Sequence, residues 1–170
     1  CMSFVGAGFA NGASGLRSGI GSGQSNTASG CMAFIGGGCL NTASGGYASF
    51  IGGGCGNSAT NTRAVVVGGN CNRACGASSF IGGGEFNVAS GTFSTTAGGF
   101  TNTASGTYSI VAGGCGNSAS GAWSSIGGGS SNAATVNRAS VGGGHANTAS
   151  GNYARVGGGF INNASGYMSV

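Results

Sequence analysis

The sequence predicts an all-β fold: a parallel β-solenoid, or β-roll, of about eleven 15-residue coils with two short strands per coil. Three observations lead to this prediction. Asparagine recurs at an almost constant spacing, buried-type residues alternate with variable ones at a period of two, and glycine gathers at two places in each unit. Stacked units of this kind bury a continuous core that one unit could not form alone.

The repeat is marked by one asparagine per unit, spaced by 15 residues except for a step of 16 from Asn41 to Asn57. We number the positions of a unit 0 to 14 from this asparagine. In the longer unit the first strand is counted forward from Asn41 and the second strand is counted back from Asn57. The unit reads Asn-Thr-Ala-Ser-Gly, two variable residues, Ser, one variable residue, Ile-Gly-Gly-Gly and two variable residues. The position-0 residues are Asn11, Asn26, Asn41, Asn57, Asn72, Asn87, Asn102, Asn117, Asn132, Asn147 and Asn162. Amides repeated at the coil spacing are expected to form a ladder that bonds each coil to the next.

The strands are predicted from the alternation inside each unit. Positions 0, 2, 7 and 9 hold Asn, Ala, Ser or Ala, and Ile or Val, and the positions between them vary. We therefore expect one strand over positions 0–3 and a second over positions 6–10, each with one buried face. Glycine at positions 4, 11 and 12 is expected at the corners, which need positive φ or tight backbone packing. Coils stacked at about 4.8 Å would make a rod about 54 Å long.

Composition excludes several classes of protein. Of 170 residues 42 are glycine and none is proline, and glycine does not fall at every third position, which excludes collagen. Glu85 is the only carboxylate side chain and His145 the only imidazole, and they lie four units apart. Paired acids or a Ser-His-Asp triad cannot be built from them in one chain, so we expect no enzyme and no cofactor.

Nucleic-acid, membrane and metal sites are not expected either. The net charge of +4 comes from five scattered arginines, too few for a nucleic-acid footprint. No apolar run approaches the 18 residues or so of a membrane span. No Cys-x-x-Cys pair indicates zinc.

The whole of residues 1–170 obeys the repeat, including partial units at both ends. We therefore expect a single repetitive segment. Because no atypical capping unit is present and the chain opens at Cys1, we expect this segment to belong to a longer fibre.

The units Asn26-Thr27-Ala28-Ser29-Gly30 and Tyr153-Ala154-Arg155-Val156-Gly157-Gly158-Gly159 resemble the head repeats of trimeric autotransporter adhesins and related fibre proteins. The resemblance covers the whole chain. It implies a left-handed parallel β-roll, often trimeric, on an extracellular fibre that adheres to surfaces. Those heads use a repeat near 14 residues. The pattern is also similar to plant-type ice-binding β-rolls, and neither family brings catalytic residues.

Positions 6 and 8 place large apolar side chains on the outer face expected for the second strand. The predicted assembly face consists of Phe4, Phe34, Phe50, Val65, Phe80, Phe93, Tyr108, Ile110, Trp123 and Tyr153. A contiguous apolar strip on a rod indicates contacts between chains, and we expect self-association. Two alternatives stay open: a reversed register that buries these side chains in a wider core, and a strip that binds carbohydrate or another surface.

The outer face of the first strand is expected to be polar, because position 3 is Ser or Thr in nearly every unit and position 1 is often Thr or Ser. Such an array could bind ice, be O-glycosylated, or face solvent. Arg73, Val88 and Asn163 interrupt it at position 1. The single N-glycosylation sequon is Asn163-Ala164-Ser165.

Seven cysteines in so thin a fold favour an oxidising compartment. Cys39 and Cys55 share position 13 in successive coils, so their Cα atoms should lie within disulfide range. Cys55 with Cys71, and Cys71 with Cys75, are competing pairs, whereas Cys1 and Cys31 are two coils apart. The alternative is a set of small buried thiols.

These observations predict a structural or adhesive fibre segment outside the cell, on a cell or virion surface. The partners would be further copies of the chain and a glycan or surface ligand. An ice-binding solenoid and a phage-type tail-fibre segment that binds a host glycan are the alternatives.

Overall fold

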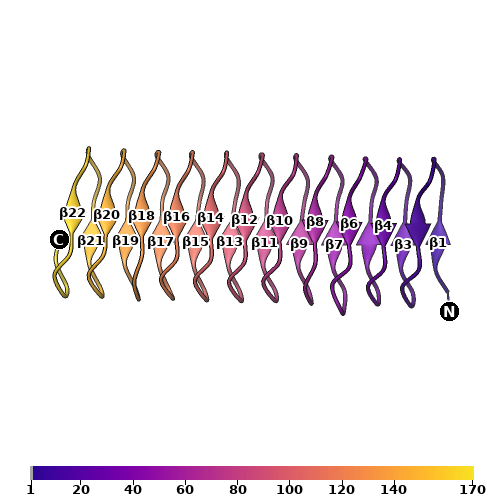
Figure 1. Ribbon diagram of the computed structural model, residues 1–170, viewed down its shortest axis with the longest axis horizontal. Coiled ribbons are helices and arrows are strands. Elements are labelled where there is room, and N and C mark those ends of the chain that lie inside the picture. Colours follow the sequence, from indigo (N-terminus) through magenta and orange to yellow (C-terminus); the bar gives the residue numbers. More distant parts are fainter. Residues whose placement is uncertain (1) are drawn as a thin grey trace.

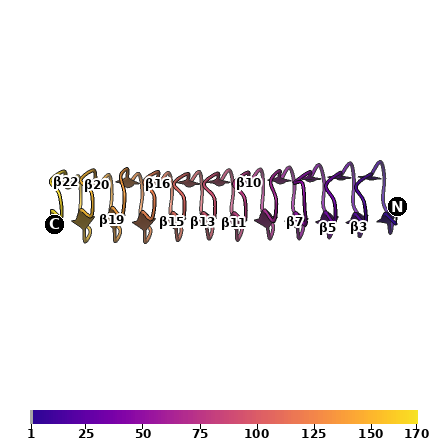
Figure 2. The ribbon, with the colours of Figure 1, turned by 90° about the horizontal axis from the view of Figure 1, so that it is seen from below.

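The computed structural model describes residues 2–170, which form a rod of stacked coils (Figure 1). Each coil contributes one two-residue strand to each of two 11-stranded parallel sheets, and residues 2–170 contain no helix. The two rows of strands run along the rod as separate layers (Figure 2). The predicted all-β parallel solenoid with two short strands per coil is confirmed.

The odd-numbered strands form the first sheet. They are β1 (Phe4–Val5), β3 (Gly19–Ile20), β5 (Phe34–Ile35), β7 (Phe50–Ile51), β9 (Val65–Val66), β11 (Phe80–Ile81), β13 (Thr95–Thr96), β15 (Ile110–Val111), β17 (Ser125–Ile126), β19 (Ser140–Val141) and β21 (Arg155–Val156). Each strand pairs in register with the same positions of the coils before and after it, as Phe80 does with Val65 and Thr95.

The even-numbered strands form the second sheet. They are β2 (Gly12–Ala13), β4 (Thr27–Ala28), β6 (Thr42–Ala43), β8 (Ser58–Ala59), β10 (Arg73–Ala74), β12 (Val88–Ala89), β14 (Thr103–Ala104), β16 (Ser118–Ala119), β18 (Ala133–Ala134), β20 (Thr148–Ala149) and β22 (Asn163–Ala164). Their register is the same, so the repeat position of a residue alone decides which residues lie above and below it.

The strands are shorter than the alternation predicts. They cover positions 1–2 and 8–9 only, whereas positions 0–3 and 6–10 were expected. The physical reason is that the residues at positions 6 and 14 have positive φ, for example 57° at Arg17, so the chain turns there. The Ser18 N–H donates to the Gly15 carbonyl at 3.1 Å and closes a four-residue turn with Arg17 as its third residue. Position 6 is therefore part of a corner.

Glycine is required at position 12, where φ lies between +81° at Gly84 and +109° at Gly23. A Cβ on Gly84 would also collide with the carbonyl oxygen of Gly99 in the next coil. Positions 6 and 14 also have positive φ, although most of their residues are not glycine, so the glycine pattern does not predict these two corners.

The interior is one narrow column of side chains between the sheets. Position 9 lies inside and is fully buried at Ile35, Ile51 and Ile81, and it faces the alanines of position 2. Position 8 lies outside. The inward positions are therefore those that the alternation predicts, and the reversed register is wrong.

Candidate functional site

A file of apolar side chains follows the outside of the odd-strand sheet. The members of this apolar ridge are Phe4, Phe34, Phe50, Val65, Phe80 and Ile110. Three of its rings touch: Phe34 and Phe50 stack with centroids 6.1 Å apart, and Phe4 reaches to within 6.3 Å of Phe34. Phe4 does so by leaning over Gly19, where an added Cβ would lie 2.5 Å from its ring. Since Phe34, Phe50 and Phe80 are still 36–38% exposed, the ridge is an open hydrophobic surface.

A column of small residues lies directly beside the ridge, at position 10. This glycine column is Gly6, Gly21, Gly36, Gly52, Gly82, Gly127, Gly142 and Gly157, with Val67, Ala97 and Ala112 in the remaining coils. A Cβ on Gly52 would lie 3.6 Å from the Phe50 ring. The outer surface of this sheet therefore has projecting rings next to a strip with few side chains.

The large residues of position 6 lie on a corner, apart from the ridge, because of their positive φ. Phe93, Tyr108 and Trp123 stack face to face, with centroids 4.9 and 4.1 Å apart. Arg138 lies over the ring of Tyr153 at 5.2 Å and donates to its hydroxyl at 2.9 Å. The expected single assembly face is therefore divided into the apolar ridge and this corner stack. A strand over positions 6–10, the basis of that expectation, does not exist.

The outside of the even-strand sheet is a hydroxyl face. Position 3 is exposed at most coils and position 1 is mostly half-buried. The hydroxyl residues at these positions are Ser14, Thr27, Ser29, Thr42, Ser44, Ser58, Thr60, Ser90, Thr103, Ser105, Ser118, Ser120, Thr135, Thr148, Ser150 and Ser165. Arg73 and Cys75 in one coil and Val88 in the next divide the array into two patches.

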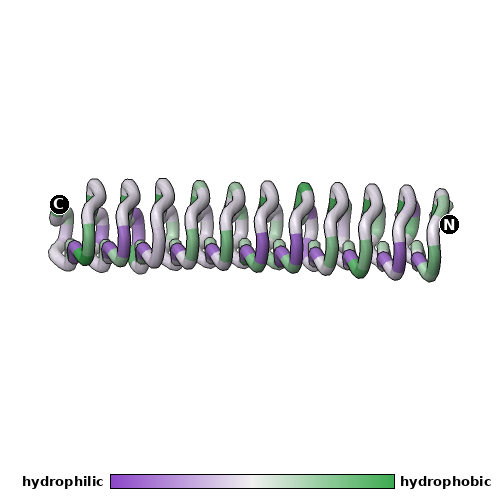
Figure 3. The backbone as a smooth tube through the Cα atoms, turned by 90° about the horizontal axis from the view of Figure 1, so that it is seen from above, coloured by the Kyte–Doolittle hydropathy of each residue, from purple (hydrophilic) through white to green (hydrophobic). Residues whose placement is uncertain are grey.

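From Asn26 to Asn147 the position-0 asparagines are buried inside the corner that joins the two sheets. Oδ1 of Asn26 accepts the backbone N–H of Asn41 at 3.0 Å. Nδ2 of Asn41 donates to the carbonyls of Gly37 in its own coil, at 3.1 Å, and of Gly54 in the next coil, at 2.9 Å. The same bonds recur along the rod, and hydrophilic segments appear at one place in coil after coil (Figure 3). Each amide therefore closes its own corner and fastens it to the next coil.

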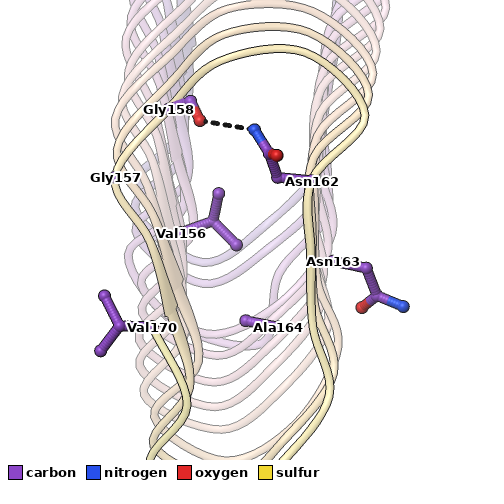
Figure 4. Close-up of a pocket in the computed structure, with 7 residues that line it drawn as sticks. All are labelled: Val156, Gly157, Gly158, Asn162, Asn163, Ala164 and Val170. Carbon is purple, nitrogen blue, oxygen red and sulfur yellow. Dashed lines mark hydrogen bonds between the residues drawn. The ribbon is translucent and has the colours of Figure 1, made fainter.

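The last coil shows the inside of the rod. A hollow of about 280 Å³ lies there among Val156, Gly157, Gly158, Asn162, Asn163, Ala164 and Val170. Val156 and Ala164 point into it, Asn163 and Val170 point outward, and Asn162 donates to the Gly158 carbonyl at 3.0 Å (Figure 4). In the preceding coils the next coil covers this space, so the hollow is rod interior and has no ligand groups of its own.

The cysteines within residues 2–170 are free thiols and mostly lie on the corners and the hydroxyl face. Cys39 and Cys55 are direct register partners in adjacent coils, and both are half-buried. A hydrogen bond with the Cys39 thiol raises the pKa of Cys55, with smaller contributions from burial and the Cys39 charge. Cys31 pairs with Tyr47, and Cys115 lies between Phe100 and Ser130. Cys1 lies outside the described residues.

Position 13 also holds the only carboxylate side chain and the only imidazole of the sequence. Glu85 lies between Asn70 and Phe100, and the imidazole of His145 stacks on Phe160 at 5.3 Å. Residues 2–170 contain no group of three or more metal-ligating side chains. The described part of the chain also has no helix that is long and apolar enough to cross a membrane.

Comparison with known proteins finds no family model that matches the chain and no significant match among curated proteins. The functional argument therefore rests on the two outer faces and their chemistry.

Proposed function

We propose that this chain is a segment of a structural or adhesive rod whose odd-strand face binds a second copy of the chain. The observation that supports this proposal most directly is the apolar ridge, a file of partly exposed apolar side chains along the odd-strand sheet in which neighbouring rings touch. A row of this kind is larger than the isolated apolar residues of an ordinary protein surface. Covering it with the same surface of another copy removes apolar area from water on both chains.

The shape of the face supports a second copy as the partner. The apolar ridge and the glycine column run side by side. The rings on the ridge of one copy can therefore pack into the glycine column of the other copy. Both copies have the same coil spacing of about 4.8 Å, so a contact made at one coil is repeated at the next. From β1 to β15 the ridge spans about 34 Å, measured as seven such steps.

Charge does not oppose this pairing strongly. The net charge of +4 is spread over 170 residues, and the ridge itself has no charged member. Seven cysteines are typical of an oxidising compartment, and we include a location on a cell or virion surface in the proposal.

The experiment is a double substitution on the ridge, Phe34→Ser with Phe50→Ser. We expect the wild-type chain to self-associate, and the variant to be mostly monomeric at the same concentration, as measured by sedimentation equilibrium. The coils themselves should stay folded, because both side chains lie outside the core.

The matched control is Thr27→Ala with Thr42→Ala, which changes the opposite face of the same two coils. This control should associate like the wild type. A wild-type chain that is monomeric at about 100 μM, in the range of a weak complex, would contradict the proposal.

A second candidate, ice binding, is favoured by the in-register hydroxyls on an extended sheet. Purified protein should then inhibit ice recrystallisation, and Thr103→Tyr should abolish the activity because the ring disrupts a flat patch. Thr95→Tyr, on the other sheet, is the control and should be active. If the wild-type protein does not inhibit ice recrystallisation, ice binding is ruled out and the self-associating rod remains as the proposed function.

A further inference from the structure

One coil differs from all the others because it holds the extra residue. Cys31 pairs in register with Tyr47, and Phe34 pairs with Phe50, so the insertion lies at Gly46 in the corner before Tyr47. In the neighbouring coils the residue at position 7 donates to the carbonyl at position 4, as Ala64 does to Asn61 at 3.1 Å. The N–H of Ser49 makes no such bond within the described chain.

This corner also leaves a polar side chain unpaired. The hydroxyl of Ser49 is buried without a hydrogen-bond partner, as are those of Ser94, Ser109 and Ser124 in coils that keep the turn bond, so the missing N–H bond alone distinguishes this corner. The bonds that hold this corner run to the neighbouring coils, among them Ala48 N–H to the Cys31 carbonyl and Arg63 N–H to the Tyr47 carbonyl, both at 2.8 Å. A segment with fewer internal bonds opens more readily than the rest of a fold. The irregular coil is therefore the weak link of the rod.

The in-register cysteine pair encloses this same coil. Cys39 comes before it, Cys55 closes it, and residues 40–54 run between them around both corners. Register partners in adjacent parallel strands have Cα atoms about 4.8 Å apart, inside the range of about 4.4–6.8 Å that disulfides use. Both thiols are half-buried on the outside of one corner.

We propose that Cys39 and Cys55 form a thiol–disulfide site that clamps the irregular coil when oxidised and releases it when reduced. The co-reactant is a small disulfide of the glutathione class. One cysteine thiolate attacks it, its S–S bond breaks, and a mixed disulfide and one glutathione thiolate result. The second cysteine thiolate then attacks the mixed disulfide and expels the other glutathione. The two cysteines lose two electrons, and their two protons end on the two glutathione thiols.

Cys31 and Cys115 have no cysteine as register partner. Cys71 is a competitor for Cys55, because its N–H donates to the Cys55 carbonyl at 2.9 Å, although it lies at position 14 with its Sγ 3.6 Å from Oδ1 of Asn70. A Cys39–Cys55 bond clamps the one coil that lacks its turn bond, and it does not depend on association between chains.

The test uses the full chain equilibrated in glutathione buffers, alkylated, and digested with trypsin. Cleavage after Arg17 and Arg63 releases residues 18–63, which contain Cys31, Cys39 and Cys55. In oxidising buffer this peptide should take up one alkyl group, and a Cys31→Ser chain should take up none. Amide hydrogen exchange of residues 45–49 should be about tenfold slower in the oxidised than in the reduced chain, because the cross-link limits local opening.

Two variants make the result decisive. Cys115→Ser should behave as the wild type, whereas deletion of Gly46 should restore the turn bond and remove most of the difference in exchange between redox states. The proposal is overturned if Cys39 and Cys55 are both alkylated in oxidising buffer, if Cys55 pairs with Cys71 instead, or if exchange at residues 45–49 is the same in both states.

Discussion

The inner and outer positions of one strand differ sharply in how much they vary along the rod. In β11 the inner residue is the buried Ile81 and the outer one is the exposed Phe80, and in β13 the inner residue is the buried Thr96 and the outer one is the half-buried Thr95. Through the odd strands the inner position holds isoleucine, valine or threonine from β3 onward, whereas the outer one ranges from phenylalanine and glycine to serine and arginine. The inner columns and the backbone therefore maintain the stack, and the outer columns are free to differ between faces and between coils.

The largest effect is expected from a charge at the inner position. Ile81→Asp buries a carboxylate with no cation inside the rod and should lower the free energy of unfolding by more than about 4 kcal/mol. Phe80→Asp, the adjacent outer substitution, should cost less than about 1 kcal/mol. Urea denaturation followed by circular dichroism measures both. Equal losses for the two variants would show that the inner column is not what holds the coil.

A smaller loss is expected at the asparagine ladder. Asn87→Ala removes the bonds to the Gly83 and Gly99 carbonyls and leaves the buried N–H of Asn102 without its acceptor. Two or three lost buried bonds should cost about 2–4 kcal/mol. Asn70→Ala, at an outer corner position, is the control and should change the denaturation midpoint little. If both alanine variants melt like the wild type, the amides do not fasten the coils.

The smallest expected effect is an increase in the free energy of unfolding. Thr96 places a hydroxyl in a column otherwise made of isoleucine and valine, and its bond to the Val88 carbonyl is long, at 3.3 Å. Thr96→Val replaces the hydroxyl with a methyl group of similar size and should stabilise the rod by about 1 kcal/mol. Thr95→Val on the outside should be nearly neutral in the same urea titration. A destabilised Thr96→Val chain would mean that the hydroxyl bond is stronger than its length indicates.

Most of the fold follows from the sequence, because the repeat fixes which residues stack on which. Once Asn11 and Asn26 are aligned, Ile20 falls on Ile35 and the inward positions follow from the period of two. The division of the surface into an apolar and a hydroxyl face follows from the same alignment.

The corners could not be predicted in the same way. Positive φ at Arg17, Tyr108 and Trp123 contradicts the usual preference of large side chains, and it arises from the turn that the stacked coils impose. That turn moves the aromatic residues of position 6 away from the ridge. The missing turn bond at Ser49 is likewise invisible in the sequence, since a one-residue insertion does not show which hydrogen bond it removes.

The short rise of each coil has a mechanical consequence. A coil of 15 residues occupies about 4.8 Å of rod, yet the same residues pulled straight span about 50 Å. Under tension, each coil that peels away would lengthen the chain roughly tenfold over the distance it occupied, so the rod is also a store of extensible length.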